Sequence, residues 1–320
     1  MKTALGLLIL FAAGLGFGQD VKLREQAERL LEHATAASSS PHLPNLERID
    51  TFRVFEDGTV KEGSFSRVVI QGVGRRDEFM FGDFHQLYVW THQRVAAVGH
   101  ELLMPPELVN VLSITPIFRG HFDAEDIIRG IAVRTVNGKT ARCISFDTVE
   151  GERTDHNEIC VDEETATIVL ERIGNELIEN SDFFPFAGAL MPGKITYSVT
   201  GGRRIEITQT MTPLTDKDTN VLAAPENAAM YKVCTTFRRP FGVSMPQPKP
   251  GNGGEVTDIV VRGLVGADGR FHDLTVQDSE RPDLNAEALA QAQQWTFMPA
   301  ICDGHPNVHE VEITLHFQGR

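Results

Sequence analysis

The sequence predicts an α+β protein of two folded domains in which antiparallel strands dominate. One amphipathic helix is expected at residues 20–36, and a long series of short strands follows it with turns about every ten residues. A compact strand-strand-helix-strand unit then occupies residues 255–320. The chain has 320 residues and 41% apolar content, which is enough to form two hydrophobic cores.

The first domain is predicted to span residues 20–229. Its helix is expected because apolar side chains recur at spacings of three and four while charged side chains take the other face; the apolar positions are Leu23, Ala27, Leu30, Leu31 and Ala34. Strands are then expected at residues 47–55, 64–71, 77–81, 86–90 and 94–98. A short helix at residues 105–112 begins with a proline pair, which suits a first helical turn.

A second strand series completes this domain. The strands are expected at residues 128–136, 140–146, 158–161, 168–173, 176–181, 193–200 and 203–211. Asn137-Gly138 joins the first two, and this dipeptide is a strong signal for a two-residue hairpin turn. Each strand has one apolar face to bury, so a curved antiparallel sheet that wraps the helix is the economical arrangement.

The second domain follows a linker that is rich in Pro and Gly at residues 230–254. Its strands are expected at residues 259–265 and 271–276, its helix at 285–294 and its last strand at 308–317. Trp295 and Phe297 alternate after the helix, so we expect them to pack it onto the sheet.

The N-terminus is interpreted as a signal peptide over residues 1–18. Lys2 precedes an apolar run at residues 4–17, and small residues at 16 and 18 suit cleavage before Gln19. A spanning helix needs roughly 20 apolar residues, so a retained anchor is the second reading. Cleavage predicts a periplasmic or secreted protein of a Gram-negative-type envelope.

Export makes disulfide bonds the expected state of the four cysteines. Cys143 and Cys160 flank a hairpin with its midpoint near residues 150–152, so their side chains are expected to lie opposite each other. Cys234 and Cys302 would then pair by elimination. Free buried thiols remain the alternative for both pairs.

No motif predicts catalysis, a cofactor or a metal site. The net charge of −14 argues against nucleic acid and against anionic lipid surfaces as partners. The Gly138-Lys139-Thr140 run lacks the first glycine of a phosphate-binding loop, because Val133 occupies that position. The histidines show no helical metal-ligand spacing, and no nucleophile motif occurs. An envelope enzyme with an unrecognised site is the remaining alternative.

Three stretches of the last domain carry a family resemblance. GADGRFHDLTV, LNAEALAQAQQWTFMPA and DGHPNVHEVEITLHF resemble the C-terminal domain of TonB-type proteins, which binds other proteins in the periplasm. The resemblance implies that an extended envelope peptide or protein adds to the edge of the last strand. The residues implied are Val308, Glu310, Glu312, Thr314 and His316. An energy-transducer variant for outer-membrane transport, anchored by residues 4–17, is the alternative function.

The first domain is similar to the LolA/LppX-type fold of envelope proteins. The similarity lies in GRRDEFMFGDFHQLYVW, in VNGKTARCISF with EICVDEETATIVLER, and in FFPFAGALMPGKI. That fold implies an incomplete β-barrel that can bind acyl chains, so a lipid or a lipoprotein is the second expected partner. Candidates for the lining of an apolar cavity are Leu23, Leu30, Val69, Phe79, Tyr88 and Trp90.

Overall fold

The structure is a computed structural model that describes residues 21–40, 42–56, 58–92, 94–99, 102–114, 121–150, 153–200, 202–215, 218–248, 256–279 and 281–318. The predicted signal peptide at residues 1–18 lies outside these ranges. The chain divides into a first unit, residues 1–39 with 118–177, and a second unit, residues 40–117 with 178–320. None of the helices within the described ranges has the length and apolarity to cross a membrane.

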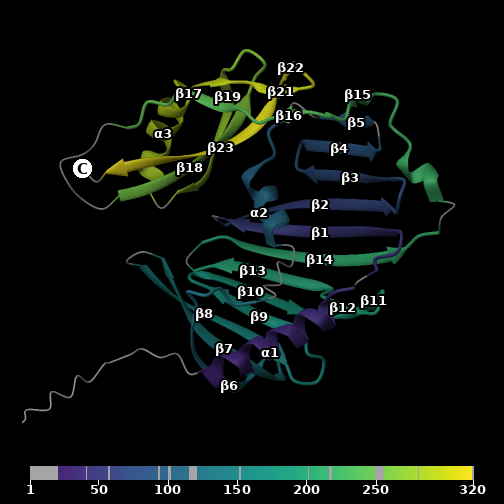
Figure 1. Ribbon diagram of the computed structural model, residues 1–320, viewed down its shortest axis with the longest axis vertical. Coiled ribbons are helices and arrows are strands. Elements are labelled where there is room, and N and C mark those ends of the chain that lie inside the picture. Colours follow the sequence, from purple (N-terminus) through teal and green to yellow (C-terminus); the bar gives the residue numbers. More distant parts are fainter. Residues whose placement is uncertain are drawn as a thin grey trace, which may run out of the picture. The chain divides into compact units, whose positions relative to one another are not determined.

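The first unit is one helix packed on four antiparallel strands. The helix is α1 (Val21–Ser38), and the strands are β6 (Ile127–Val136), β7 (Lys139–Glu150), β8 (Arg153–Asp162) and β9 (Ile168–Ile173), in the order β9-β8-β7-β6. In Figure 1, α1 lies along β6, β7 and β8. Ala27, Leu31 and Ala34 are fully buried in a core with Phe146 and Ile159.

Two sequence signals set the strand register in this unit. Asn137 and Gly138 both have positive φ, 51° and 79°, and they form the predicted two-residue turn between β6 and β7. Cys143 lies directly opposite Cys160 in the β7–β8 pair, and the two form a disulfide bond. The predicted hairpin and the predicted pairing of these cysteines are therefore both confirmed.

The second unit contains a large open antiparallel sheet in the order β15-β5-β4-β3-β2-β1-β14-β13-β10. Its strands are β1 (Leu46–Glu56), β2 (Thr59–Ile70), β3 (Gly74–Phe81), β4 (Phe84–Thr91), β5 (Arg94–Val98), β10 (Glu176–Ser181), β13 (Lys194–Val199), β14 (Arg204–Pro213) and β15 (Ala229–Lys232). The α+β fold class with predominant antiparallel strands is confirmed.

The helix in the core of this sheet is α2 (Pro106–Ile114), and not the longer α1. Its buried residues Leu108, Val111 and Ile114 pack against aromatic side chains that include Phe52 and Phe79. The sequence predicted that the strands wrap the helix at residues 20–36, which does pack on β6 to β8, but it did not predict that α2 fills this second core. Both helices have an apolar stripe, and a stripe does not specify which sheet it will cover.

Several short elements complete the second unit. The hairpin of β11 (Phe184–Phe186) and β12 (Ala189–Met191) was not predicted, because Ala187 takes a positive φ of 50° in its turn and alanine is not a turn signal. A 3₁₀ helix, η1 (Asp218–Leu222), follows β14.

The C-terminal module, residues 256–318, has the predicted strand-strand-helix-strand order. Its elements are β18 (Val256–Val265), β19 (Phe271–Ser279), η2 (Pro282–Leu284), α3 (Asn285–Ala292), β20 (Thr296–Met298), β21 (Ala300–Cys302), β22 (His305–Asn307) and β23 (His309–Gln318). Figure 1 shows α3 against β18 and β19. Trp295 and Phe297 are buried in the core beneath it, as predicted.

The Pro- and Gly-rich linker at residues 230–254, which was expected to be irregular from residue 238 onward, contains paired strands. Beyond β15, which pairs with β5, the strands β16 (Phe237–Arg238) and β17 (Phe241–Ser244) pair with β21 and β20. Its prolines and glycines limit each pair to two to four residues but do not prevent pairing. The prediction of irregular structure was therefore wrong for these segments.

A clip of covalent and polar bonds holds the start of this segment to the C-terminal module. Cys234 and Cys302 form the second disulfide bond, as predicted. The Oδ1 atom of Asp303 accepts hydrogen bonds from the amide and hydroxyl of Thr235 at 2.9 and 2.6 Å. It also accepts from the amide and hydroxyl of Thr236 at 2.7 and 3.1 Å. Together these hydrogen bonds lower the pKa of Asp303 to about 2, and the bond from the Thr235 hydroxyl contributes most to the shift.

Asp303 is expected to make the clip acid-sensitive. Because its folded-state pKa is lowered, its stabilisation is complete above its usual pKa of 3.8 and is lost as the pH falls through about 2. Hydrogen-exchange protection of the Thr235 and Thr236 amides should therefore fall between these pH values. In Asp303→Ala we expect low protection at every pH.

The matched control is Asp268→Ala, which removes a carboxylate that bonds the Arg270 amide in another turn of the module. This variant should leave the protection of Thr235 and Thr236 unchanged. Equal protection in wild type and Asp303→Ala at pH 6 would show that the carboxylate does not hold the clip.

Candidate binding edge and cavities

The strand β23 lies at one edge of the C-terminal sheet, whose strand order is β19-β18-β23. It is paired with β18 along its whole length, with Val261 opposite Ile313 and Ile259 opposite Leu315. No strand within the described part of the chain pairs with its other side. An edge strand of this kind can accept an added strand through its backbone N–H and C=O groups.

The side chains of β23 alternate between a buried and an exposed face. Val311, Ile313, Leu315 and Phe317 pack in the core of the C-terminal module. On the other face lie four of the five residues predicted from the sequence, namely Glu310, Glu312, Thr314 and His316. The fifth, Val308, directly precedes the strand.

Side-chain contacts lie at both ends of the exposed face. His316 Nδ1 lies 2.7 Å from a carboxylate oxygen of Asp258 on β18. At the other end, Glu310 forms an ion pair with Arg262, whose side chain is only 6% exposed. Burial is the main cause that lowers the pKa of Arg262 below its usual value. A buried guanidinium needs such partners to offset its lost hydration.

Arg262 also connects the C-terminal module to the segment around α2. It donates to the carbonyl oxygen of Met104 at 3.4 Å and to Oε1 of Gln277 at 3.1 Å. Gln277 in turn donates to Oδ1 of Asn110 in α2 at 2.7 Å. Sequence reasoning missed this residue, although a lone arginine within the apolar run IVVRGLV of β18 was a usable signal.

A cavity of about 310 Å³ adjoins the start of β23. It is lined by side chains of the large sheet, of the segment before α2 and of the C-terminal module. The lining includes three of the predicted cavity residues, Phe79, Tyr88 and Trp90, and two of the predicted edge residues, Val308 and Glu310. Leu102 and Met104, which the sequence did not single out, add further apolar surface.

The other three predicted cavity residues lie elsewhere. Val69 lines a neighbouring cavity of about 390 Å³ together with Trp90. Leu23 and Leu30 are half-buried on α1 and pack against the core of the first unit. The six residues therefore contribute to different cores and cavities. Whether any of these spaces binds a lipid stays a prediction.

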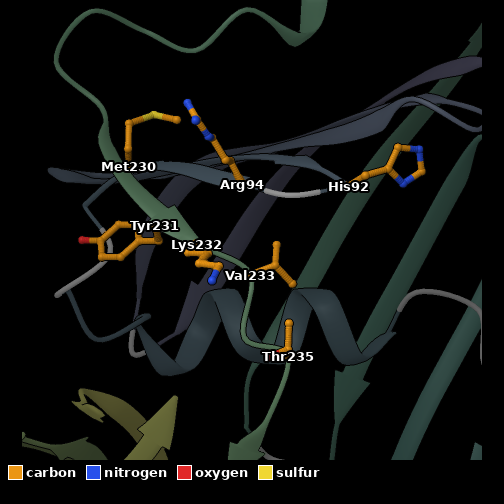
Figure 2. A pocket seen from close by; sticks show the side chains of 7 residues that line it. All are labelled: His92, Arg94, Met230, Tyr231, Lys232, Val233 and Thr235. Atoms are coloured by element: carbon orange, nitrogen blue, oxygen red, sulfur yellow. The ribbon is translucent and has the colours of Figure 1, made fainter. Parts of the chain in front are cut away.

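A further cavity, of about 530 Å³, lies beside the β5–β15 pair and is shown in Figure 2. Arg94 and Lys232 are directly opposite each other in this pair, and Figure 2 shows their side chains extending in different directions. His92, Met230 and Val233 complete much of the lining. Arg94 and Lys232 make this cavity basic, and like charges opposite one another repel. Met230 and Val233 make part of its wall apolar.

One cluster of metal-ligand side chains occurs among the described residues, and it consists of Cys143, Cys160 and Glu158. The two sulfur atoms are joined in the disulfide bond, so they are not thiolate ligands in this state. The sequence predicted no catalytic residue and no cofactor site, and this cluster does not test either prediction.

Residues 252–318 match the family described as the Gram-negative bacterial TonB protein C-terminal. The match covers the C-terminal module and confirms the resemblance seen in the sequence. No curated protein matches the chain.

Solved structures with similar topology cover the N-terminal part or more of the chain. A putative outer membrane lipoprotein-sorting protein domain from Vibrio parahaemolyticus is 10% identical and has a TM-score of 0.36, with 62% of this chain and 99% of that one covered. A LolA superfamily protein from Nitrosomonas europaea is 10% identical, with 61% and 96% covered and a TM-score of 0.36. It belongs by name to the superfamily that residues 20–229 resemble.

The complex of MucA and MucB from Pseudomonas aeruginosa is a third similar structure. The identity is 12%, the TM-score is 0.28, and 76% of this chain and 81% of that chain are covered.

Removal of Glu310 and removal of Arg262 from their ion pair should lower the free energy of unfolding by different amounts. Glu310→Gln leaves the Arg262 guanidinium buried without its charge partner, and we expect it to lower the free energy of unfolding by about 2 kcal/mol. Arg262→Met should lower the free energy of unfolding by a smaller amount, because Glu310 is 39% exposed and water can hydrate its carboxylate again. Urea unfolding measures both.

Glu62→Gln is the control, because the Arg53–Glu62 pair in the same unit is exposed. It should change the free energy of unfolding by less than about 0.5 kcal/mol. If Arg262→Met lowers the free energy of unfolding as much as Glu310→Gln or more, the buried guanidinium does not depend on Glu310 as we expect.

Proposed function

We propose that this protein is a non-enzymatic binding protein of the Gram-negative envelope. In this proposal residues 1–18 are removed on export, and the C-terminal module captures an extended segment of an envelope protein. The family match of residues 252–318 and the two disulfide bonds suggest a periplasmic location. The observation that carries the binding role is the position of β23, which is paired on one side only.

Strand addition is the binding mode that this edge supports. An added strand would satisfy the backbone N–H and C=O groups on the outer side of β23, and backbone bonding supplies affinity without requiring one particular sequence. Alternate side chains of the ligand would then contact the exposed face that carries Glu310, Glu312, Thr314 and His316. The buried face keeps this strand in one register, because a shift of one residue would expose Ile313 and Leu315.

A lipid or a lipoprotein acyl chain is the second proposed ligand. The cavity lined by Phe79, Tyr88, Trp90 and Leu102 supports it, because aromatic and aliphatic side chains make up much of its wall. Its volume of about 310 Å³ lies at the lower end of the usual range for ligand sites, roughly 300–1,000 Å³. A short or partly inserted acyl chain fits this size better than a whole lipid.

The family match also favours a second candidate, an energy-transducer variant for outer-membrane transport that is anchored by residues 4–17. Coupling to an inner-membrane partner would then require that segment to be retained. Mass spectrometry of the mature N-terminus separates the two functions. A start at Gln19 supports the exported binding protein, and a start at Met1 supports the transducer.

Peptide capture is expected to depend on the outer side of β23. A fluorescent peptide of alternating Thr and Val, with blocked ends, should bind the protein, and anisotropy measures its affinity. Thr314→Pro removes a backbone donor and disturbs the edge, so the affinity should fall at least about tenfold, which equals the loss of one or two hydrogen bonds.

Thr275→Pro is the matched control, since Thr275 lies on β19 at the opposite edge of the same sheet. Circular dichroism would first establish that both variants fold. Equal loss in the two variants, or no peptide binding by the folded wild type, would reject capture at β23.

Acyl binding is expected to depend on the wall of the cavity. Titration with palmitate should shift the fluorescence of Trp90, and native mass spectrometry should detect the bound acid. Leu102→Ser makes the wall polar and should weaken binding several-fold.

Met80→Ser is its control, because Met80 follows Phe79 on β3, is absent from the cavity wall and is exposed to the same degree as Leu102, 49% against 48%. Retention of no acyl ligand, or equal weakening by both substitutions, would refute this part of the proposal.

A further inference from the structure

Three of the large apolar side chains that face solvent gather where β17 pairs with β20. Phe241 is 70% exposed, Val243 is 64% exposed and Met298 is nearly half exposed. We refer to these three residues as the apolar patch. Exposed apolar side chains are normal when they are scattered, but a cluster of them marks a contact surface.

Strand pairing explains why these side chains lie together. Phe241 is directly opposite Met298 in the β17–β20 pair, so both project on the same face. The register of this pair is irregular between Gly242 and Ser244, which places Val243 at the irregular position. Met245 is not part of the patch, because its side chain lies over Gly242 on the face that Gly242 shares with the buried Phe297.

The chain around the apolar patch is basic. Between Glu226 and Glu255 there is no acidic residue, whereas Lys232, Arg238, Arg239 and Lys249 all occur there. This contrasts with a whole chain that has 44 acidic and 30 basic residues. The segment therefore departs locally from the net charge of −14 and attracts anions.

Arg238 and Arg239 are the basic residues nearest to the patch in sequence. Both are exposed, and no carboxylate within the described ranges pairs with either. Elsewhere the arginines of the sheet are typically held by acids, as Arg67 is by Asp77 at 2.7 Å. Two unpaired guanidinium groups that lie two and three residues before Phe241 in the chain are suited to a surface that is both anionic and apolar.

We infer that the apolar patch, with Arg238 and Arg239, docks the protein on the surface of an anionic phospholipid bilayer. The aromatic and aliphatic side chains enter the boundary between head groups and acyl chains, and the guanidinium groups bind lipid phosphates. Charge complementarity between the acid-free segment and an anionic lipid surface carries this assignment. It revises the expectation from net charge alone, which argued against such a surface.

The size of the patch favours a bilayer over a protein partner. A stable protein interface buries about 800 Å² on each side, which is more than three side chains supply. Interfacial membrane binding requires only a few inserted apolar groups that are supported by cations. The acyl cavity is a different surface, because none of the three patch residues lines it.

The test uses the purified full chain and large vesicles of neutral phosphatidylcholine, with or without anionic phosphatidylglycerol. Val243→Cys is labelled with a polarity-sensitive dye, which reports insertion locally whatever the N-terminus does. The dye emission should increase several-fold on anionic vesicles and little on neutral ones. Raised salt should reduce the increase.

Val133→Cys is the matched control, because Val133 on β6 is equally exposed, at 63%, and lies outside the patch. Its dye should not respond. In the labelled protein, Arg238→Gln and Arg239→Gln should each weaken vesicle binding about fivefold, and Arg172→Gln on β9 should not.

Phe241→Ser should abolish most of the response at position 243. The inference is overturned if the dye at position 243 does not respond, or if it responds equally at position 133. It is also overturned if Phe241→Ser leaves the response unchanged. If Phe241→Ser instead converts a dimer to a monomer in sedimentation without any vesicle response, the patch joins two copies of the chain and the bilayer assignment is wrong.

Discussion

The pairing of β23 with β18 is the interaction on which the C-terminal module depends. Its register places Ile313 and Leu315 in the core, and among the described strands it leaves β23 at the edge of the sheet. The same pairing brings Glu310 next to the buried Arg262, which is bonded to Met104 and Gln277. A single strand pair therefore determines the core of the module, its open edge and its contact with the segment before α2.

Local patterns predicted much of this structure correctly. Alternation of apolar and polar residues identified β23 and its exposed residues, since side chains of a strand alternate strictly between faces. Asn137-Gly138 identified a hairpin because both residues accept positive φ. Symmetry about a turn identified the Cys143–Cys160 pair, and elimination then gave Cys234–Cys302. Each of these inferences needed only neighbours along the chain.

Features that depend on distant segments were not predictable in the same way. The apolar stripe of α1 did not reveal that it covers β6 to β8, or that α2 fills the core of the large sheet. The segment at residues 230–254 forms short strands only because β5, β20 and β21 offer partners. For the candidate sites, Leu102 and Met104 gave no local signal, whereas Phe79, Tyr88 and Trp90 were found from their alternation.

The Cys234–Cys302 bond has a mechanical consequence for anything that pulls on the C-terminal strand. All of β23 lies after Cys302, so tension applied to this strand reaches the covalent bond once residues 303–318 have been stretched. From there the load passes directly to residue 234 and bypasses the residues in between. The strands β18 and β19 and the helix α3 are thereby protected from being unravelled by force, because they all lie within the bypassed loop.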